Sequence, residues 1–151
     1  MTCASNRFED LSGANNTITK NGDTRIQTLS PFVQSSSVPV SYGGYFDGSG
    51  DYLTVSGGLP SGQGTAFTLE TWFYTNDVTR VSNTITEGSS SGSLDFYVDS
   101  TGAIKLDNTG LSGIAASSAN VIKSNTWYHI ALTRTTGNLY TIYVNGTSVA
   151  G

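Results

Sequence analysis

The sequence has a single cysteine, few charged residues and no long apolar run, and each scarcity excludes a class of protein. Cys3 is the only cysteine among 151 residues, so no internal disulfide framework can hold the fold. A chain of this length buries roughly two-thirds of its unfolded surface and needs no such staple. We expect Cys3 to be a free thiol in a loose N-terminus, with an intermolecular disulfide as the alternative.

Positive charge is also scarce. Charged residues make up only 12 % of the chain, the net charge is −4, and the seven Lys and Arg residues are scattered singly. Nucleic-acid binding requires clustered cations that displace counterions. No apolar run approaches the roughly 20 residues that span a bilayer, and no basic amphipathic helix is present to bind a membrane surface. We therefore expect neither nucleic-acid binding nor membrane insertion.

Helical periodicity is the third absence. No window of a dozen residues places apolar side chains at helical spacing. Ser, Thr, Gly and Asn dominate instead; Thr favours strands, and the other three favour turns. Short strand-like segments recur every 8–12 residues or so with turn residues between them, which is typical of an antiparallel sandwich or barrel. The sequence therefore predicts an all-β protein.

The expected strands can be placed by alternation and by turn signals. In Leu94–Val98, the apolar side chains of Leu94, Phe96 and Val98 face one way. Leu111–Ser118 is small and polar, which predicts an irregular return. Loops are expected at Gly57–Gly64 and Gly88–Gly92. The other expected strands are Thr17–Lys20, Thr24–Leu29, Tyr45–Asp47, Tyr52–Val55, Phe67–Tyr74, Ser82–Glu87, Ala103–Leu106, Trp127–Arg134 and Leu139–Val144, with a last strand beginning at Thr147.

Four segments in this order carry a family resemblance: GGYFDGSGDYLTV, FTLETWFY, LDFYVDSTGAIKL and NTWYHIALTRTTGNLYTIYVNG. Together they resemble the laminin-G-like branch of the concanavalin A-like lectin/glucanase superfamily, over roughly Tyr42 to Gly151. The resemblance implies an antiparallel jelly-roll β-sandwich that serves binding or adhesion. Many members recognise glycans, some bind calcium, and a related branch hydrolyses polysaccharides. The upstream piece DLSGANNTITKNGDTRIQTLSPF resembles the lead-in of such domains in bacteriophage and marine viral structural proteins.

From the resemblance we expect one domain over residues 1–151, with 1–41 as a lead-in and 42–151 as the sandwich core. Members of the family continue past the YVNG hairpin with a closing C-terminal strand that is missing here, which would leave a sheet edge open to partners. A fragment of a longer protein, a closing strand from another chain and an N-terminal segment that fills the gap are the three explanations.

The partners expected are a glycan or other subunits of the same assembly, including a homo-oligomer formed through the open edge. The expected location is extracellular or in a virion. Met1–Arg7 has no apolar core of a secretory signal, so export would use lysis, another route or a larger particle.

Two pairs of residues are candidate binding groups. Asp47 and Asp51 flank Gly48-Ser49-Gly50 and could supply the carboxylates of a calcium site, although Asp in such turns also bonds backbone N–H groups. The segment YGGYFDGSGDYLTV then predicts a hairpin about those three residues. Tyr97, with Asp95 on the same face of its strand, is the candidate for stacking on a sugar, against the alternative of an ordinary exposed aromatic.

The remaining side chains with chemical potential are assigned structural roles. Trp72 and Trp127 are expected in the core, because large aromatics dominate cores. His129 lacks the neighbours of a zinc site and is expected to be a hydrogen-bonded strand residue.

Hydrolysis of a glycan requires two carboxylates across the scissile bond. The hydrolytic branch aligns such acids on one strand, a cluster that this chain lacks. We therefore expect a non-enzymatic glycan-binding module. The alternative is a purely structural virion component, such as a decoration or fibre protein.

Overall fold

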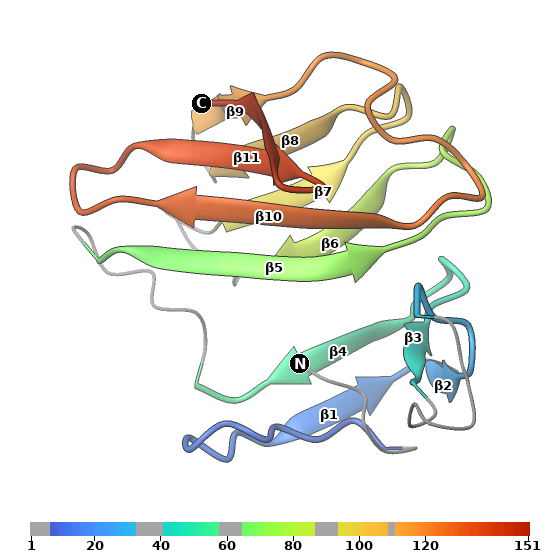
Figure 1. The fold of residues 1–151 in the computed structure, drawn as a ribbon. Coiled ribbons are helices and arrows are strands. Elements are labelled where there is room, and N and C mark those ends of the chain that lie inside the picture. Colours follow the sequence, from blue (N-terminus) through green and yellow to red (C-terminus); the bar gives the residue numbers. More distant parts are fainter. Residues whose placement is uncertain (1–6, 33–40, 58–64, 87–93, 109–110) are drawn as a thin grey trace. The chain divides into compact units, whose positions relative to one another are not determined.

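The described part of the computed structural model contains strands and no helix. It covers residues 7–32, 41–57, 65–86, 94–108 and 111–151 (Figure 1). Every strand pairing within it is antiparallel. The all-β prediction is therefore confirmed. Among these residues no helix is long and apolar enough to cross a membrane. Cys3 and the predicted loop Gly88–Gly92 lie outside the described residues.

The chain divides into two compact units, Met1–Gly57 and Gly58–Gly151. The first contains two small sheets, in which β1 pairs with β4 and β2 pairs with β3. Its strands are β1 (Ile18–Asn21), β2 (Arg25–Gln27), β3 (Gly43–Tyr45) and β4 (Tyr52–Val55).

The predicted hairpin about Gly48-Ser49-Gly50 is wrong. The strands on either side of this loop do not pair with each other, because β3 takes β2 as its partner and β4 takes β1. Residues 42–55 thus pair with strands of the predicted lead-in, and the compact units divide after Gly57 rather than at residue 41. A single domain over residues 1–151 stays a prediction.

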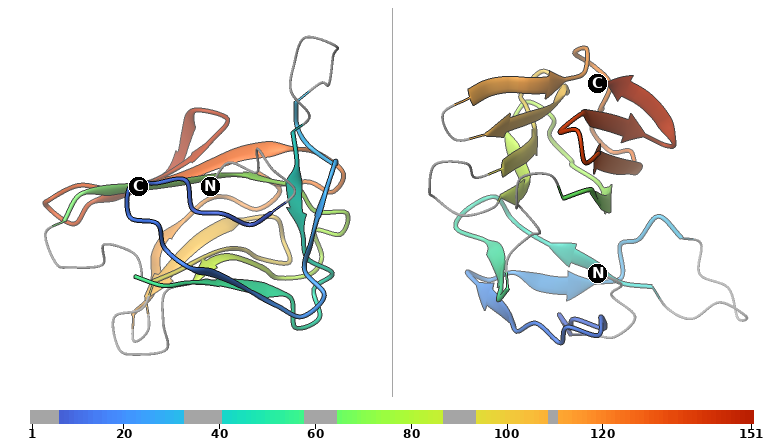
Figure 2. Two further views of the ribbon diagram at one scale, coloured as in Figure 1. Left: turned by 90° about the horizontal axis from the view of Figure 1, so that it is seen from below. Right: turned by 90° about the vertical axis from the view of Figure 1, so that its left-hand side faces the viewer.

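The second unit contains two four-stranded sheets that lie in two layers (Figure 2). One sheet has the order β12-β11-β10-β5 and the other has the order β6-β7-β8-β9. Their strands are β5 (Phe67–Phe73), β6 (Ser82–Thr86), β7 (Leu94–Val98), β8 (Ile104–Asn108), β9 (Leu111–Ala116), β10 (Tyr128–Arg134), β11 (Tyr140–Val144) and β12 (Thr147–Ala150).

The core lies between these two sheets. Ile130 and Leu132 of β10 join Phe96 and Leu106 of the opposite sheet in one buried apolar cluster. The predicted alternation in β7 is confirmed, since Leu94, Phe96 and Val98 are buried whereas Asp95 and Tyr97 are half-buried on the other face. Burial of one face from each sheet is what stabilises a β-sandwich.

The C-terminal half shows one error and one success of the strand prediction. Leu111–Ser118 is not an irregular return, because β9 pairs with β8 over this stretch. Its small residues do not prevent pairing, and Ala115 reaches the core opposite Leu106. The strand predicted to begin at Thr147 is confirmed as β12, which pairs with β11.

Candidate functional site

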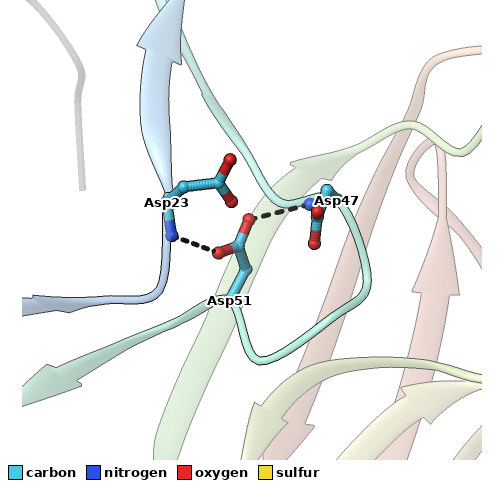
Figure 3. A group of neighbouring side chains, drawn as sticks. All are labelled: Asp23, Asp47 and Asp51. Atoms are coloured by element: carbon cyan, nitrogen blue, oxygen red, sulfur yellow. Dashed lines mark hydrogen bonds between the residues drawn. The ribbon is translucent and has the colours of Figure 1, made fainter.

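Three aspartates of the first unit gather where two loops meet (Figure 3). One carboxylate oxygen each from Asp23, Asp47 and Asp51 lies within 4.8 Å of the others. Asp47 and Asp51 come from the β3–β4 loop, as predicted, and Asp23 comes from the turn after β1. The sequence prediction missed Asp23, because only the β1–β4 pairing brings that turn beside the loop.

Asp51 is the hydrogen-bonding centre of this aspartate cluster, which is defined as Asp23, Asp47 and Asp51. Its Oδ2 accepts the N–H of Asp47 at 2.9 Å, and its Oδ1 accepts the N–H of Asp23 at 2.8 Å. These bonds, the one from Asp47 above all, lower the pKa of Asp51. Asp47 Oδ1 in turn accepts the N–H of Ser49 at 2.7 Å. The carboxylates thus tie the two loops together, as turn aspartates do.

The aspartate cluster also has the ligands that calcium prefers. Calcium takes six to eight oxygens, often from several carboxylates, and each carboxylate oxygen can accept a further contact beside a hydrogen bond. The Asp23 carboxylate is exposed, and it forms a long ion pair of 3.8 Å with Arg25. The residues present therefore fit a calcium ion, and they also fit a turn that needs none.

Tyr97 and Asp95 do share the outer face of β7, and the structure adds a third residue to them. Asp107 of β8 lies directly opposite Asp95, and its Oδ2 accepts the hydroxyl hydrogen of Tyr97 at 2.7 Å. This hydrogen bond, together with burial and the nearby aspartate charges, raises the pKa of Tyr97 to about 12. The sequence prediction missed Asp107 because cross-strand register decides its neighbours. The Tyr97 hydroxyl is therefore already engaged within the sheet.

Asp99 closes the β7–β8 turn and has a structural role. Its Oδ1 accepts the N–H of Thr101 at 2.8 Å and that of Ala103 at 3.1 Å, while its Oδ2 lies 2.7 Å from Lys105 Nζ. Burial alone would raise the pKa of Asp99, but the bonds from Lys105 and Thr101 outweigh it and hold the pKa well below its usual range.

Trp72 is not a core residue, and that prediction is wrong. Its side chain is 42 % exposed, and it points away from Leu69 and Phe73, which pack against the core. The alternation of β5 decides this, since residues two apart share a face. Across the strands Trp72 pairs with His129 of β10, with ring centroids 5.4 Å apart and planes at 56°.

A second aromatic pair lies next to the first. Tyr74 and Trp127 follow and precede the paired strands, and their ring centroids are 5.2 Å apart with planes at 44°. Tyr74 donates its hydroxyl to Asn125 Oδ1 at 3.1 Å. Trp127 is half-buried but lies outside the apolar cluster of the core, so its predicted core position is also wrong. We call Trp72, Tyr74, Trp127 and His129 the aromatic face.

Polar groups border the aromatic face. Glu70 is 63 % exposed at its side chain, and its Oε2 lies 3.4 Å from His129 Nε2. The backbone N–H of His129 donates to Asn145 Oδ1 at 2.9 Å. An exposed carboxylate, an imidazole and large rings together offer stacking surface and hydrogen-bonding groups. No residue of this face was among the binding residues predicted from the sequence, although the alternation in FTLETWFY could have indicated Glu70 and Trp72.

Comparison with known proteins gives one match. The laminin-G family model described as the concanavalin A-like lectin/glucanases superfamily matches residues 47–151. No curated protein and no solved structure matches the chain. The matched segment includes Asp47 and Asp51 of the aspartate cluster, both sheets of the second unit and the whole aromatic face.

Proposed function

The chain belongs to the concanavalin A-like lectin/glucanase superfamily, and on that premise we propose that it is a non-enzymatic module for glycan recognition in a larger extracellular or virion assembly. Membership suggests a carbohydrate-binding or adhesion-type module, and the observation that supports the glycan is the exposed Trp72 beside Glu70. Rings with a nearby polar group suit sugars, which have apolar faces and hydroxyl rims.

A glycan array, screened with and without calcium, tests this proposal. We expect the folded protein to retain at least one class of oligosaccharide on the array. The absence of binding in both conditions would overturn glycan recognition and leave the structural alternative.

Calcium binding is a separate proposal for the aspartate cluster. If calcium binds there, millimolar calcium should raise the midpoint of thermal unfolding, because a ligand that binds only the folded state stabilises it. Asp23→Asn should remove this shift while it leaves the hydrogen bonds to the Asp51 carboxylate in place. An equal midpoint for the wild type with calcium or with EDTA would contradict the calcium site and support the turn interpretation.

That the protein has no hydrolytic activity is also a proposal. Asp95 and Asp107 are the pair of residues that could contradict it. Two carboxylates opposite each other on neighbouring strands resemble the paired acids of glycoside hydrolysis. However, Asp107 accepts the Tyr97 hydroxyl hydrogen, which suits a structural role. We expect no release of reducing ends from β-glucans. Release that is abolished by Asp107→Asn would establish a hydrolase instead.

The alternative function is that of a purely structural virion component, such as a decoration or fibre protein of the phage and marine viral type. Val81 and Leu139 are exposed large apolar side chains, and contacts between subunits would remove such groups from water. Native mass measurement tests it: a strict monomer at working concentration argues against assembly through subunit contacts or an open sheet edge.

A further inference from the structure

We infer that the aromatic face binds one or two pyranose rings of an uncharged, soluble oligosaccharide, with Glu70 and Asn125 as hydrogen-bonding groups at its border. This inference rests on the proposed glycan recognition and names its site and ligand class. It moves the binding site from Tyr97 and Asp95 to the opposite sheet of the second unit, on the side that faces away from the core.

The strand register places all four rings of the aromatic face on one side of the β5–β10 pair. Trp72 lies opposite His129, and Phe73 lies opposite Tyr128. Because side chains alternate, Tyr74 and Trp127 continue on the same side as Trp72 and His129, and the contact between their rings agrees with this. The inward neighbours Phe73 and Tyr128 pack against the core, whereas none of the four rings does.

Ring orientation limits the shape of the ligand. The two pairs are two residues apart along the strands, so roughly 7 Å separates them, which is comparable with one or two sugar rings. Within each pair the planes are inclined by 56° and 44°. The two rings of each pair therefore do not form one flat platform, which disfavours contact with the flat face of an insoluble polysaccharide. This uneven surface can hold the apolar faces of single pyranose rings.

Charge limits the ligand further. Glu70 is an exposed charged side chain next to the Trp72–His129 pair, with Oε2 at 3.4 Å from His129 Nε2, and its carboxylate can accept hydrogen bonds from sugar hydroxyls. The same negative charge repels uronic and sulfated sugars. At the other end, Asn125 combines a hydrogen-bond acceptor, already used by Tyr74, with an amide donor. These groups select uncharged sugars with hydroxyls at the ring edge.

The Tyr97 side of the molecule is a weaker candidate for stacking. Tyr97 is half-buried and has charged neighbours, since Lys105 lies opposite it, Asp95 shares its face of β7, and Asp107 accepts its hydroxyl hydrogen. Tyr97→Ala therefore separates the two possible sites. Tyr52→Ala serves as the matched control, because Tyr52 is an exposed aromatic of β4 in the other unit.

The experiment titrates wild type and variants with the best binder among cellohexaose, laminarihexaose, maltohexaose and chitohexaose, with hexagalacturonate and a heparin hexasaccharide as acidic probes. Microcrystalline cellulose serves as the flat, insoluble probe. We expect Trp72→Ala and Trp127→Ala each to weaken binding by about tenfold or more, since each removes a stacking ring. Trp72→Phe should restore part of the affinity, and Tyr52→Ala should not change it. Unchanged circular dichroism shows that the variants fold.

The outcomes test the location of the binding site and the proposed glycan recognition separately. Loss of binding in Tyr97→Ala, with full binding in both tryptophan variants, would overturn the aromatic face while glycan recognition stands. Preference for the acidic probes or for cellulose alone would overturn the ligand class. No binding to any probe by wild type would overturn the inference, and a blank glycan array would overturn the proposed function with it.

Discussion

Aspartate side chains hold several turns of this protein at the scale of single residues. Asp10 accepts the backbone N–H of Ser12 and that of Asn16. The Ser12 hydroxyl, followed by these two N–H groups, lowers the pKa of Asp10 to about 2. Asp51 accepts backbone N–H groups from two loops of the first unit, and Asp99 accepts such groups from the β7–β8 turn. A carboxylate that accepts several N–H groups is favoured in its ionised form. The turns should therefore weaken in acid.

Gly22 lies so close to the aspartate cluster that a side chain at this position would not fit. Its φ is +69°, and an added Cβ would collide with Asp51 Oδ1 and lie 2.8 Å from the Gly50 carbonyl oxygen. Gly22→Ala should lower the free energy of unfolding by about 1–3 kcal/mol. The matched control is Gly50→Ala, because Gly50 has φ +75° but open space around it. Equal urea midpoints for the two variants would contradict the predicted collision.

Asp99 should make stability dependent on pH in a defined direction. Its pKa is lowered in the folded state, so its contribution is present above the unfolded pKa of about 3.9 and is lost as the pH falls below it. Asp99→Asn should cost about 2 kcal/mol at pH 6, since it removes hydrogen bonds to a charged group. The difference in free energy of unfolding between Asp99→Asn and wild type should decrease towards pH 2.

Urea unfolding at both pH values measures this gap. Asp77→Asn is a suitable control, because Asp77 also accepts the backbone N–H and the hydroxyl hydrogen of Thr79, whereas the ion pair with Lys105 belongs to Asp99. Asp77→Asn should lower the free energy of unfolding by less than Asp99→Asn does. A gap between Asp99→Asn and wild type that stays constant from pH 6 to pH 2 would refute the role of the Asp99 charge.

Strand pairing decides the surface chemistry at the scale of elements. β5 presents Leu69 and Phe73 to the core, and its other face carries Glu70 and Trp72. Pairing with β10 then places His129 beside Trp72. Pairing of the two antiparallel strands thus places side chains from both on one surface, because residues opposite each other in a sheet are neighbours.

The sequence could predict the fold class and most strands, because alternation and turn residues act locally. It could not predict the hairpin region correctly, since β3 and β4 find partners elsewhere in the chain. Asp23 was missed for the same reason, since the β1–β4 pairing brings it to the loop. Asp107 was missed because the register of the consecutive strands β7 and β8 decides that it lies beside Tyr97. The prediction that Trp72 lies in the core was wrong because it followed the residue type and not the alternation of side chains along β5.

Substitutions in these strands test which face is the core. Leu132 is fully buried, so Leu132→Ala should cost about 2–5 kcal/mol. Trp72→Ala should cost about 1 kcal/mol, the value of a cross-strand pair, although a buried Trp would cost about 3–5 kcal/mol. Free energies of unfolding from urea titration decide whether the Trp72 side chain is exposed or in the core. If Trp72→Ala destabilises as much as Leu132→Ala, Trp72 belongs to the core after all.

At the scale of the whole molecule, the chain combines a small two-sheet unit with a β-sandwich unit, and the superfamily match spans part of the first and all of the second. The two candidate sites lie in different units: the aspartate cluster in the first and the aromatic face in the second. Calcium and glycan can therefore be tested independently, by Asp23→Asn and by Trp72→Ala.

Intrinsic tryptophan fluorescence tests the central claim most directly. The chain has only two tryptophans, and both belong to the aromatic face. Titration with the oligosaccharide selected by the array should change the emission of the protein in a saturable way and protect it from quenching by acrylamide. Saturable binding by calorimetry without any change in emission or quenching would contradict a glycan site at Trp72 and Trp127.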